Sequence, residues 1–197
     1  MMASTHIAFA SLMMVACSVA ILQRMPQVHE VAIAGAAGLL PDLDHPKSTF
    51  GRIVPYISTP IAAVFGHRGF THSLLMVAVI IWLLLTQREQ QNWPVLPLVV
   101  GYFSHIIGDM LTPSGVPLLW PIRQKFSLNL FKADGAIERV IYRACWLGVG
   151  YFLWVAMQRP GDAWIQPLQA SLQSWLWQAI NHSRVMLVQL VQTLAAA

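Results

Sequence analysis

The chain alternates apolar segments with polar connections, and this alternation limits the folds that are open to it. The apolar segments cover about residues 7–22, 28–40, 73–86, 94–111, 139–156 and 174–195. Their apolar residues do not alternate with period two, so strands are not expected. Hydrophobic residues make up 56% of the chain and charged residues only 10%, where an ordinary soluble protein has about a quarter charged. We therefore predict an all-α fold: one domain, residues 1–197, that forms a multi-helix integral membrane bundle.

The lengths of these segments differ in what they allow. A helix that crosses the hydrocarbon core needs about 20 residues, and the fourth and fifth segments come nearest to this. The second segment is rich in Ala and Gly, which suits tight packing against another helix. The last carries polar residues and is expected to lie at the membrane interface. No Lys or Arg precedes the first segment, so we predict a retained helix rather than a signal peptide, and His6 stays in the protein.

Two long polar connections, residues 41–72 and 112–138, separate these segments and are expected to form a site. Their many Pro and Gly residues favour fixed turns over long helices. If segments 73–86 and 94–111 run out and back, both connections lie on the same face and the turn 87–93 lies on the other. By the positive-inside rule, the cations of the connections place that face in the cytoplasm. These cations are Lys47, Arg52, Arg68, Arg123, Lys125 and Lys132, against Arg24, Arg88 and Arg159 on the opposite face.

The scarce ionisable residues gather at the same end of the apolar segments. Four separate stretches carry them, and in the topology above all four converge on one layer. The candidate metal ligands in these stretches are His6, Asp42, Asp44, His67, His72, His105 and Asp109.

His105 and Asp109 form the most specific pair. Their i, i+4 spacing puts both side chains on one helix face, within reach of one cation. An aspartate near hydrocarbon is costly unless it is paired or bound to metal. The alternative is that the two side chains only pair with each other inside the bundle.

Asp42 and Asp44 flank Leu43 in the stretch P-D-L-D-H-P. If this turn is extended, alternation directs both carboxylates to one side, where they repel unless a cation lies between them. Either residue could instead serve as a helix cap or an Asx turn. His45, rather than Asp44, could also be the residue that faces the site.

The stretch G-H-R-G-F-T-H-S-L places His67 and His72 around Arg68. We expect Thr71 to cap the following helix, with His72 at its first position. The alternative for each histidine is a capping or interfacial role. Arg68 could pair with a carboxylate or bind a substrate phosphate through two hydrogen bonds.

Together the candidate ligands form a mixed nitrogen and oxygen set of the kind that suits zinc or manganese. The chain has no G-x-S-x-G nucleophile elbow, no P-loop and no G-x-G-x-x-G fingerprint. Its basic residues are scattered singly, so charge alone predicts no nucleic-acid partner. The chemistry that the sequence favours is metal chemistry.

The sequence resembles the YdjM-type family through P-D-L-D-H-P at 41–46, F-G-H-R-G-F-T-H-S-L at 65–74 and G-Y-F-S-H-I-I-G-D-M-L-T-P-S-G-V-P-L-L-W-P at 101–121. The resemblance covers about residues 1–123. It implies a bacterial inner-membrane protein of a group described as LexA-regulated metal-dependent hydrolases, which places it in the SOS response.

A more distant likeness is to zinc phospholipase C and the related zinc nucleases, which are all-helical. In that group an N-terminal histidine, an aspartate after a helix and H-x-x-x-D pairs hold a zinc cluster. This sequence has H-x-x-x-D once where the group has it twice, so the likeness implies one or two metal ions rather than three.

From these patterns we predict an inner-membrane hydrolase that uses zinc, or alternatively manganese, to cleave a phosphoester of lipid or nucleotide type. Asp44 and His72 are the candidate catalytic residues and Arg68 the candidate substrate-binding residue. The expected partners are the lipid bilayer and the phosphoester. One alternative is a membrane protein that binds or transports metal without catalysis. Another is a soluble helical hydrolase whose short apolar segments form its core.

Overall fold

The computed structural model describes residues 1–65, 68–86, 94–122 and 124–158. In these ranges the fold is all-helical, as predicted, and an isolated bridge between Val116 and Phe126 is the nearest approach to a strand. The predicted turn 87–93 and the apolar segment 174–195 lie outside the described residues. The α-helices are α1 (Ala3–Ala20), α2 (Val28–Ala37), α3 (Pro55–Phe65), α4 (Leu74–Thr86), α5 (Val95–Met110) and α6 (Ala136–Gln158), with short 3₁₀ helices η1 (Pro41–Asp44) and η2 (Phe70–His72).

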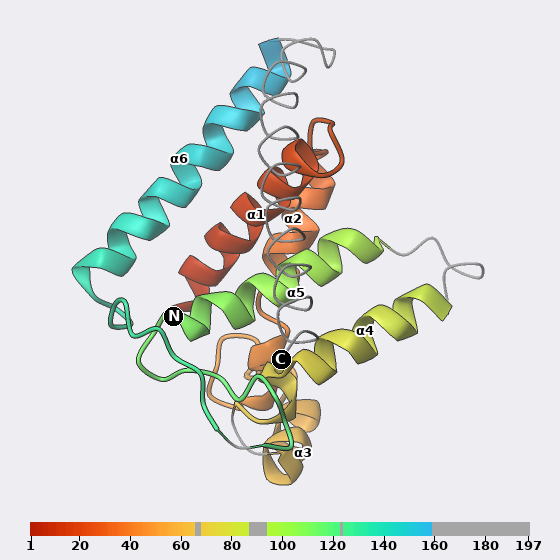
Figure 1. Ribbon diagram of the computed structural model, residues 1–197, viewed down its shortest axis with the longest axis vertical. Coiled ribbons are helices and arrows are strands. Elements are labelled where there is room, and N and C mark those ends of the chain that lie inside the picture. Colours follow the sequence, from red (N-terminus) through yellow and green to blue (C-terminus); the bar gives the residue numbers. More distant parts are fainter. Residues whose placement is uncertain (66–67, 87–93, 123, 159–197) are drawn as a thin grey trace, which may run out of the picture.

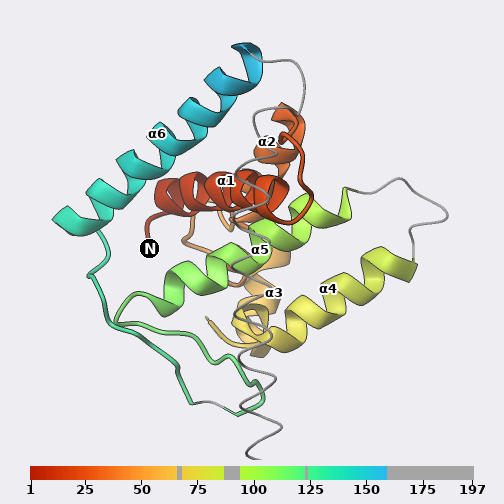
Figure 2. The same ribbon diagram turned by 45° about the horizontal axis from the view of Figure 1, so that its top comes forward.

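Helices α1, α2 and α5 pack against one another and form the centre of the described structure. Helix α6 packs on α1, and α4 packs on α5 (Figure 1 and Figure 2). Val15, Val31 and Val149 join α1, α2 and α6 in one buried apolar cluster. Tyr102 and Ile106 of α5 belong to a second cluster, which faces α4. The ends of α1 and α5 that lie near η1 and η2 carry His6, His105 and Asp109.

The Ala- and Gly-rich segment packs as tightly as its composition predicts. A Cβ atom added at Gly101 of α5 would lie 2.2 Å from the carbonyl oxygen of Ala34 and 2.7 Å from the Cβ of Ala37, both on α2. Only glycine permits the two helix backbones to approach this closely. One turn later on α5 lies His105, so this contact also fixes the distance between α2 and the candidate site.

Gly101→Ala is expected to destabilise the protein by about 1–3 kcal/mol, because the added methyl group meets backbone that cannot move without separating α2 from α5. Thermal unfolding of the purified protein in detergent measures the effect. Gly150→Ala is the matched control, because a Cβ atom there meets nothing within 4 Å. Since Gly150 lies within α6, alanine should raise the stability slightly. Equal melting temperatures for the two variants would contradict the close contact between α2 and α5.

The connection 41–72 differs from its prediction. Its prolines favoured turns, yet the structure has an eleven-residue helix, α3, which packs against η1. Pro55 is the first residue of α3, where its fixed φ fits a helix. Pro60 lies inside the helix, where a proline removes one backbone hydrogen bond. The described residues of the connection 112–138 form no helix before α6, as predicted.

Helix length also differs from the prediction. Among the described helices, α1 is the one that is long and apolar enough to cross a membrane, and half of its residues are buried by the rest of the structure. Helix α5 has 16 residues, a rise of about 24 Å, which is short of a hydrocarbon core. The fifth segment forms the 23-residue α6, which carries Glu138, Arg139 and Arg143 in its first turns.

Candidate metal centre

Six of the seven predicted ligands lie together at the end of the helices next to η1 and η2. His6 comes from α1, Asp42 and Asp44 from η1, His72 from η2, and His105 and Asp109 from α5. His67 lies outside the described residues. Neither His45 nor Asp44 belongs to the two groups of potential metal ligands, but Asp44 contacts His72.

His105 and Asp109 share one face of α5, as their spacing predicts, and neither side chain is exposed to solvent. The Nε2 atom of His105 lies 3.8 Å from Oδ2 of Asp109. On the other edge of the ring, Nδ1 lies 2.6 Å from the carbonyl oxygen of Gly38. A carbonyl only accepts hydrogen bonds, so Nδ1 carries the proton and Nε2 presents its lone pair to the cluster.

His72 is oriented in the same way by Asp44. The Nδ1 atom of His72 lies 3.2 Å from Oδ2 of Asp44, and both side chains are fully buried. The same oxygen accepts hydrogen bonds from the Thr71 hydroxyl and from the backbone N–H of Arg68. The Thr71 hydroxyl donates its proton to Asp44, so its oxygen, 3.0 Å from Nδ1 of His72, accepts from that ring. Nδ1 therefore carries the proton, and the Nε2 lone pair of His72 also points into the cluster.

The two lone pairs meet inside the cluster, since Nε2 of His72 lies 3.2 Å from Nε2 of His105. Two acceptor nitrogens at this distance repel each other unless one ring gains a second proton or a cation lies between them. Oδ1 of Asp42 lies 3.9 Å from the first nitrogen and 3.7 Å from the second. Oδ2 of Asp109 lies 3.8 Å from each. Each of these two carboxylate oxygens therefore lies within 3.9 Å of both nitrogens.

The two aspartates of η1 approach His72 from opposite edges of its ring, which corrects the extended arrangement. In an extended turn both carboxylates would point to one side, but η1 is a 3₁₀ helix. Asp42 faces Nε2 and is 19% exposed, whereas Asp44 faces Nδ1 and is completely buried.

His6 extends the cluster on the α1 side. Its ring stacks on that of His105 with centroids 3.7 Å apart, and its Nε2 lies 3.3 Å from Oδ1 of Asp109. The amino group of Met1 donates to the same oxygen at 2.6 Å. The Nδ1 atom of His6 is buried and has no hydrogen-bond partner among the described residues. His105 thus belongs to two overlapping groups, one with His6 and Asp109 and one with Asp42 and His72.

Arg68 closes the side of the cluster that solvent reaches. Its side chain is 17% exposed, and Nη2 lies 2.8 Å from Oδ2 of Asp109. Its backbone has a positive φ of 56°, which turns the N–H toward Asp44. The Nε–H group is buried without a hydrogen-bond partner in the described part of the chain.

The residues that hold the ligands are the ones that the sequence does not reveal. Thr71 was expected to cap the helix after it, but its hydroxyl donates to Asp44 instead. Ser73 is the residue whose hydroxyl accepts the N–H of Met76 at the start of α4. Tyr102 fixes this segment by donating to the carbonyl of Thr71 at 2.5 Å. The carbonyl of Gly38 leaves no signal in a side-chain pattern.

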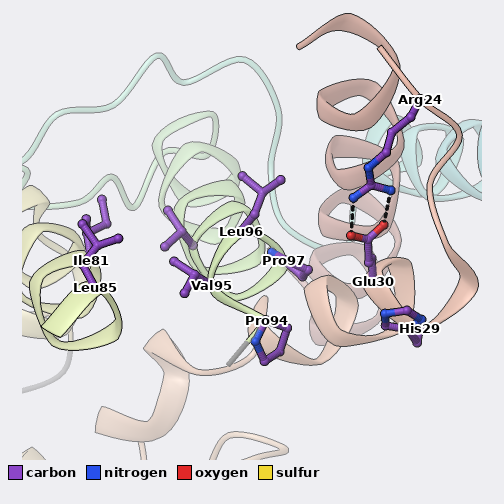
Figure 3. Close-up of a pocket in the computed structure, with 10 residues that line it drawn as sticks. Arg24, His29, Glu30, Ile81, Leu85, Pro94, Val95, Leu96 and Pro97 are labelled. Atoms are coloured by element: carbon purple, nitrogen blue, oxygen red, sulfur yellow. Dashed lines mark hydrogen bonds and ion pairs between the residues drawn. The ribbon is translucent and has the colours of Figure 1, made fainter. Parts of the chain in front are cut away.

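A cavity lies at the other end of the helices, far from the cluster of His and Asp residues. Its volume is about 620 Å³, and its lining includes Ile81, Val95 and the paired side chains of Arg24 and Glu30 (Figure 3). Val95 is fourteen residues before Asp109 on α5, a rise of about 21 Å. The two hydrogen bonds between Arg24 and Glu30, at 2.7 and 2.5 Å, raise the pKa of the guanidinium, so it stays charged. The cavity brings no further metal-ligating group to the cluster.

Comparison with known proteins places the chain among inner membrane proteins. The model of a family described as "YdjM inner membrane protein" matches residues 1–188. The chain is 38% identical over 164 residues to the inner membrane protein YdjM of Escherichia coli (strain K12) and to that of Shigella flexneri, which covers 78% of this chain and 82% of each relative. It is 34% identical over 127 residues to YvsG of Bacillus subtilis (strain 168), covering 64% of this chain and 79% of that protein. No solved structure matches the chain.

Proposed function

The chain belongs to the YdjM family of inner membrane proteins, and from this premise we propose that it is a metal-dependent hydrolase of the inner membrane that cleaves a phosphoester. In this proposal the apolar helices form a multi-pass bundle, and the cluster of His and Asp residues faces the cytoplasm. The observation that carries the proposal is the convergence of His72 and His105, through their unprotonated nitrogens, with Asp42 and Asp109.

The spacing of these donor atoms supports zinc as the ion. Zinc bonds of 2.0–2.1 Å with tetrahedral geometry place neighbouring donors about 3.3–3.4 Å apart. The separations of 3.2, 3.7, 3.8 and 3.9 Å between the donor atoms come close to this value. Manganese accepts the same mixed set of imidazole and carboxylate ligands. His6, which stacks on His105 and contacts Asp109, supplies the donor that a second ion needs.

Asp44 supports the site by orienting His72 rather than by binding the ion. A carboxylate behind a ligating histidine fixes its tautomer and strengthens its basicity. The carbonyl of Gly38 does the same for His105. We therefore assign Asp44 a positioning role and His72 a ligand role.

The remaining groups fit the binding and cleavage of a phosphoester. A divalent cation held by these donors lowers the pKa of a bound water and polarises a phosphoryl oxygen. Among the carboxylates of the cluster, that of Asp42 is partly exposed to solvent, so it is placed to accept a proton from water at the edge of the cluster. The buried Nε–H of Arg68 can donate to a substrate oxygen on the same side.

One observation favours a second candidate function, a protein that binds or transports metal without catalysis. Four protein donors fill a tetrahedral zinc site completely, as in structural sites. The two functions make different use of Asp42. In a closed site Asp42 would be the fourth ligand, whereas in the hydrolase a water would take that position and Asp42 would accept its proton.

We expect purified protein to contain one or two divalent ions per chain and to hydrolyse a phosphodiester. A metal analysis and a screen with bis(p-nitrophenyl) phosphate, phospholipids and nucleotides provide the measurement. Chelation should abolish hydrolysis, and added zinc or manganese should restore it.

Asp42→Asn is expected to lower kcat about 100-fold or more, the usual loss when a general base is removed, while most of the metal stays bound to the other donors. Asp134→Asn is the matched control, because Asp134 is an exposed carboxylate outside the cluster. The non-catalytic function would be supported instead if the parent binds metal stoichiometrically but hydrolyses no substrate, and if Asp42→Asn loses that metal.

A further inference from the structure

A second polar site lies beside the cluster at the start of α6. Arg139, Tyr142 and Arg143 follow the i, i+3, i+4 spacing, so their side chains share one face of the helix. With Met2 and Ser4 they line a cavity of about 300 Å³. Both ribbon views show the beginning of α6 beside the N-terminus (Figure 1 and Figure 2).

No carboxylate of the described residues balances the charge of this face. Arg139 and Arg143 form no ion pair with any carboxylate of the described residues. Their neighbour Glu138 is fully buried, and its two oxygens accept the backbone N–H groups of Met2 at 2.6 Å and of Asp134 at 2.5 Å. Both oxygens of this carboxylate are thus engaged by backbone N–H groups. Like charges at i, i+4 destabilise a helix, so an anion between them would relieve a cost that the sequence retains.

We propose that this cavity binds a phosphate group between the guanidinium groups of Arg139 and Arg143. Guanidinium donors match phosphate oxygens with paired hydrogen bonds, which a lysine cannot reproduce. The hydroxyl groups of Ser4 and Tyr142, which line the same cavity, add neutral donors. A volume of about 300 Å³ is at the small end of ligand sites and accommodates a phosphate with part of its ester.

The cavity is linked to the metal centre by two consecutive residues. Met2 donates its N–H to Glu138 at the base of α6, and the amino group of Met1 donates to Asp109. A ligand in the cavity therefore lies next to the segment that contacts the cluster. The substrate of the proposed hydrolase also contains a phosphate group, but phosphate binding in this cavity needs neither bound metal nor turnover.

Phosphate binding by the full chain tests the proposal directly. Inorganic phosphate is titrated into detergent-purified protein at constant ionic strength with chloride, after a chelator has removed metal, and the dissociation constant is taken from the rise in melting temperature. Arg143→Gln and Arg139→Gln are each expected to weaken phosphate binding at least tenfold. Without phosphate, neither variant should melt below the parent, because each removes a like-charge repulsion.

Lys132→Gln is the control, since Lys132 is an exposed cation of the connection that leads to α6 and lies outside the cavity. It should bind phosphate as the parent does. Tyr142→Phe removes one hydroxyl group with little risk to the fold and should weaken binding several-fold. Equal phosphate affinity in Arg143→Gln, Lys132→Gln and the parent would overturn the proposal.

Micelles that contain phosphatidic acid identify the source of the phosphate. If these micelles compete with inorganic phosphate for the parent, the site binds a lipid headgroup. Phosphatidylcholine micelles should not compete, and Arg143→Gln should show no competition with either lipid. Phosphate binding that phosphatidic acid does not displace assigns it to a soluble phosphoester. If the protein binds phosphate here but hydrolyses no phosphoester, the phosphate site is supported and the proposed function is wrong.

Discussion

Replacing His105 or Asp109 with alanine is expected to lower the metal content of the purified protein by at least half. Each change removes a donor atom from the centre of the cluster, where Nε2 of His105 and Oδ2 of Asp109 lie 3.8 Å apart. Loss of a partner that only supports a ligand costs about 10–100-fold in metal affinity, so loss of the ligand itself should cost about 100-fold or more. Metal analysis and competition with a chelating dye measure content and affinity separately.

Lys47→Ala provides the control for this experiment, because Lys47 is exposed in the connection that follows η1. Its metal content should equal that of the parent. His72→Asn serves as a third cluster variant with a smaller effect on folding, because asparagine keeps a polar side chain at this buried position. Asparagine keeps a hydrogen-bonding group for Asp44 but loses the nitrogen donor, so this protein should fold and bind metal poorly. Full metal occupancy in all three cluster variants would contradict the proposed metal centre.

An impermeant maleimide is expected to label a cysteine at position 91 in intact cells and to leave a cysteine at position 49 unlabelled. Gln91 lies in the turn 87–93, outside the described residues, and Thr49 lies in the connection that carries the cluster. Thr49 is preferred to Ser48, because the Ser48 hydroxyl holds the turn through hydrogen bonds to Asp42 and Gly51. The contrast should be all-or-none because the reagent does not cross the membrane, and the positive-inside rule predicts its direction.

Both native cysteines, Cys17 and Cys145, are free thiols and are replaced with serine before labelling. Permeabilised cells, in which both introduced cysteines should react, show that each one is accessible. The reverse pattern in intact cells would place the cluster on the periplasmic side and would contradict the proposed orientation.

The sequence predicted the helices and the meeting of the ionisable residues well, because both follow from the apolar pattern. An apolar run sets where a helix lies within a few residues, and residues at corresponding ends of packed helices must come together. The spacing of His105 and Asp109 also fixes their common face without knowledge of the rest of the chain.

The details that decide the chemistry could not be read in this way. Whether Asp42 and Asp44 lie on one side or on opposite edges of His72 depends on a 3₁₀ turn rather than an extended one. The two conformations differ by backbone angles for which a P-D-L-D stretch has no strong preference. Helix α3 was missed because its prolines look like turn residues, although Pro55 is placed where a helix accepts it. The carbonyl of Gly38 is a backbone group, which every residue carries.

The order of the ligands along the chain has a consequence for biosynthesis. His6 leaves the ribosome about a hundred residues before Asp109, and His72 and His105 come between them. At about 5–20 residues per second, some 5–20 s pass between the first ligand and the last. Until residue 105 has been added, the carboxylate of Asp42 lacks one of the two imidazoles that face it in the folded protein. The cluster therefore closes only after α5 has been synthesised, so in the proposed metal centre a shortage of metal would act on the maturation of the protein.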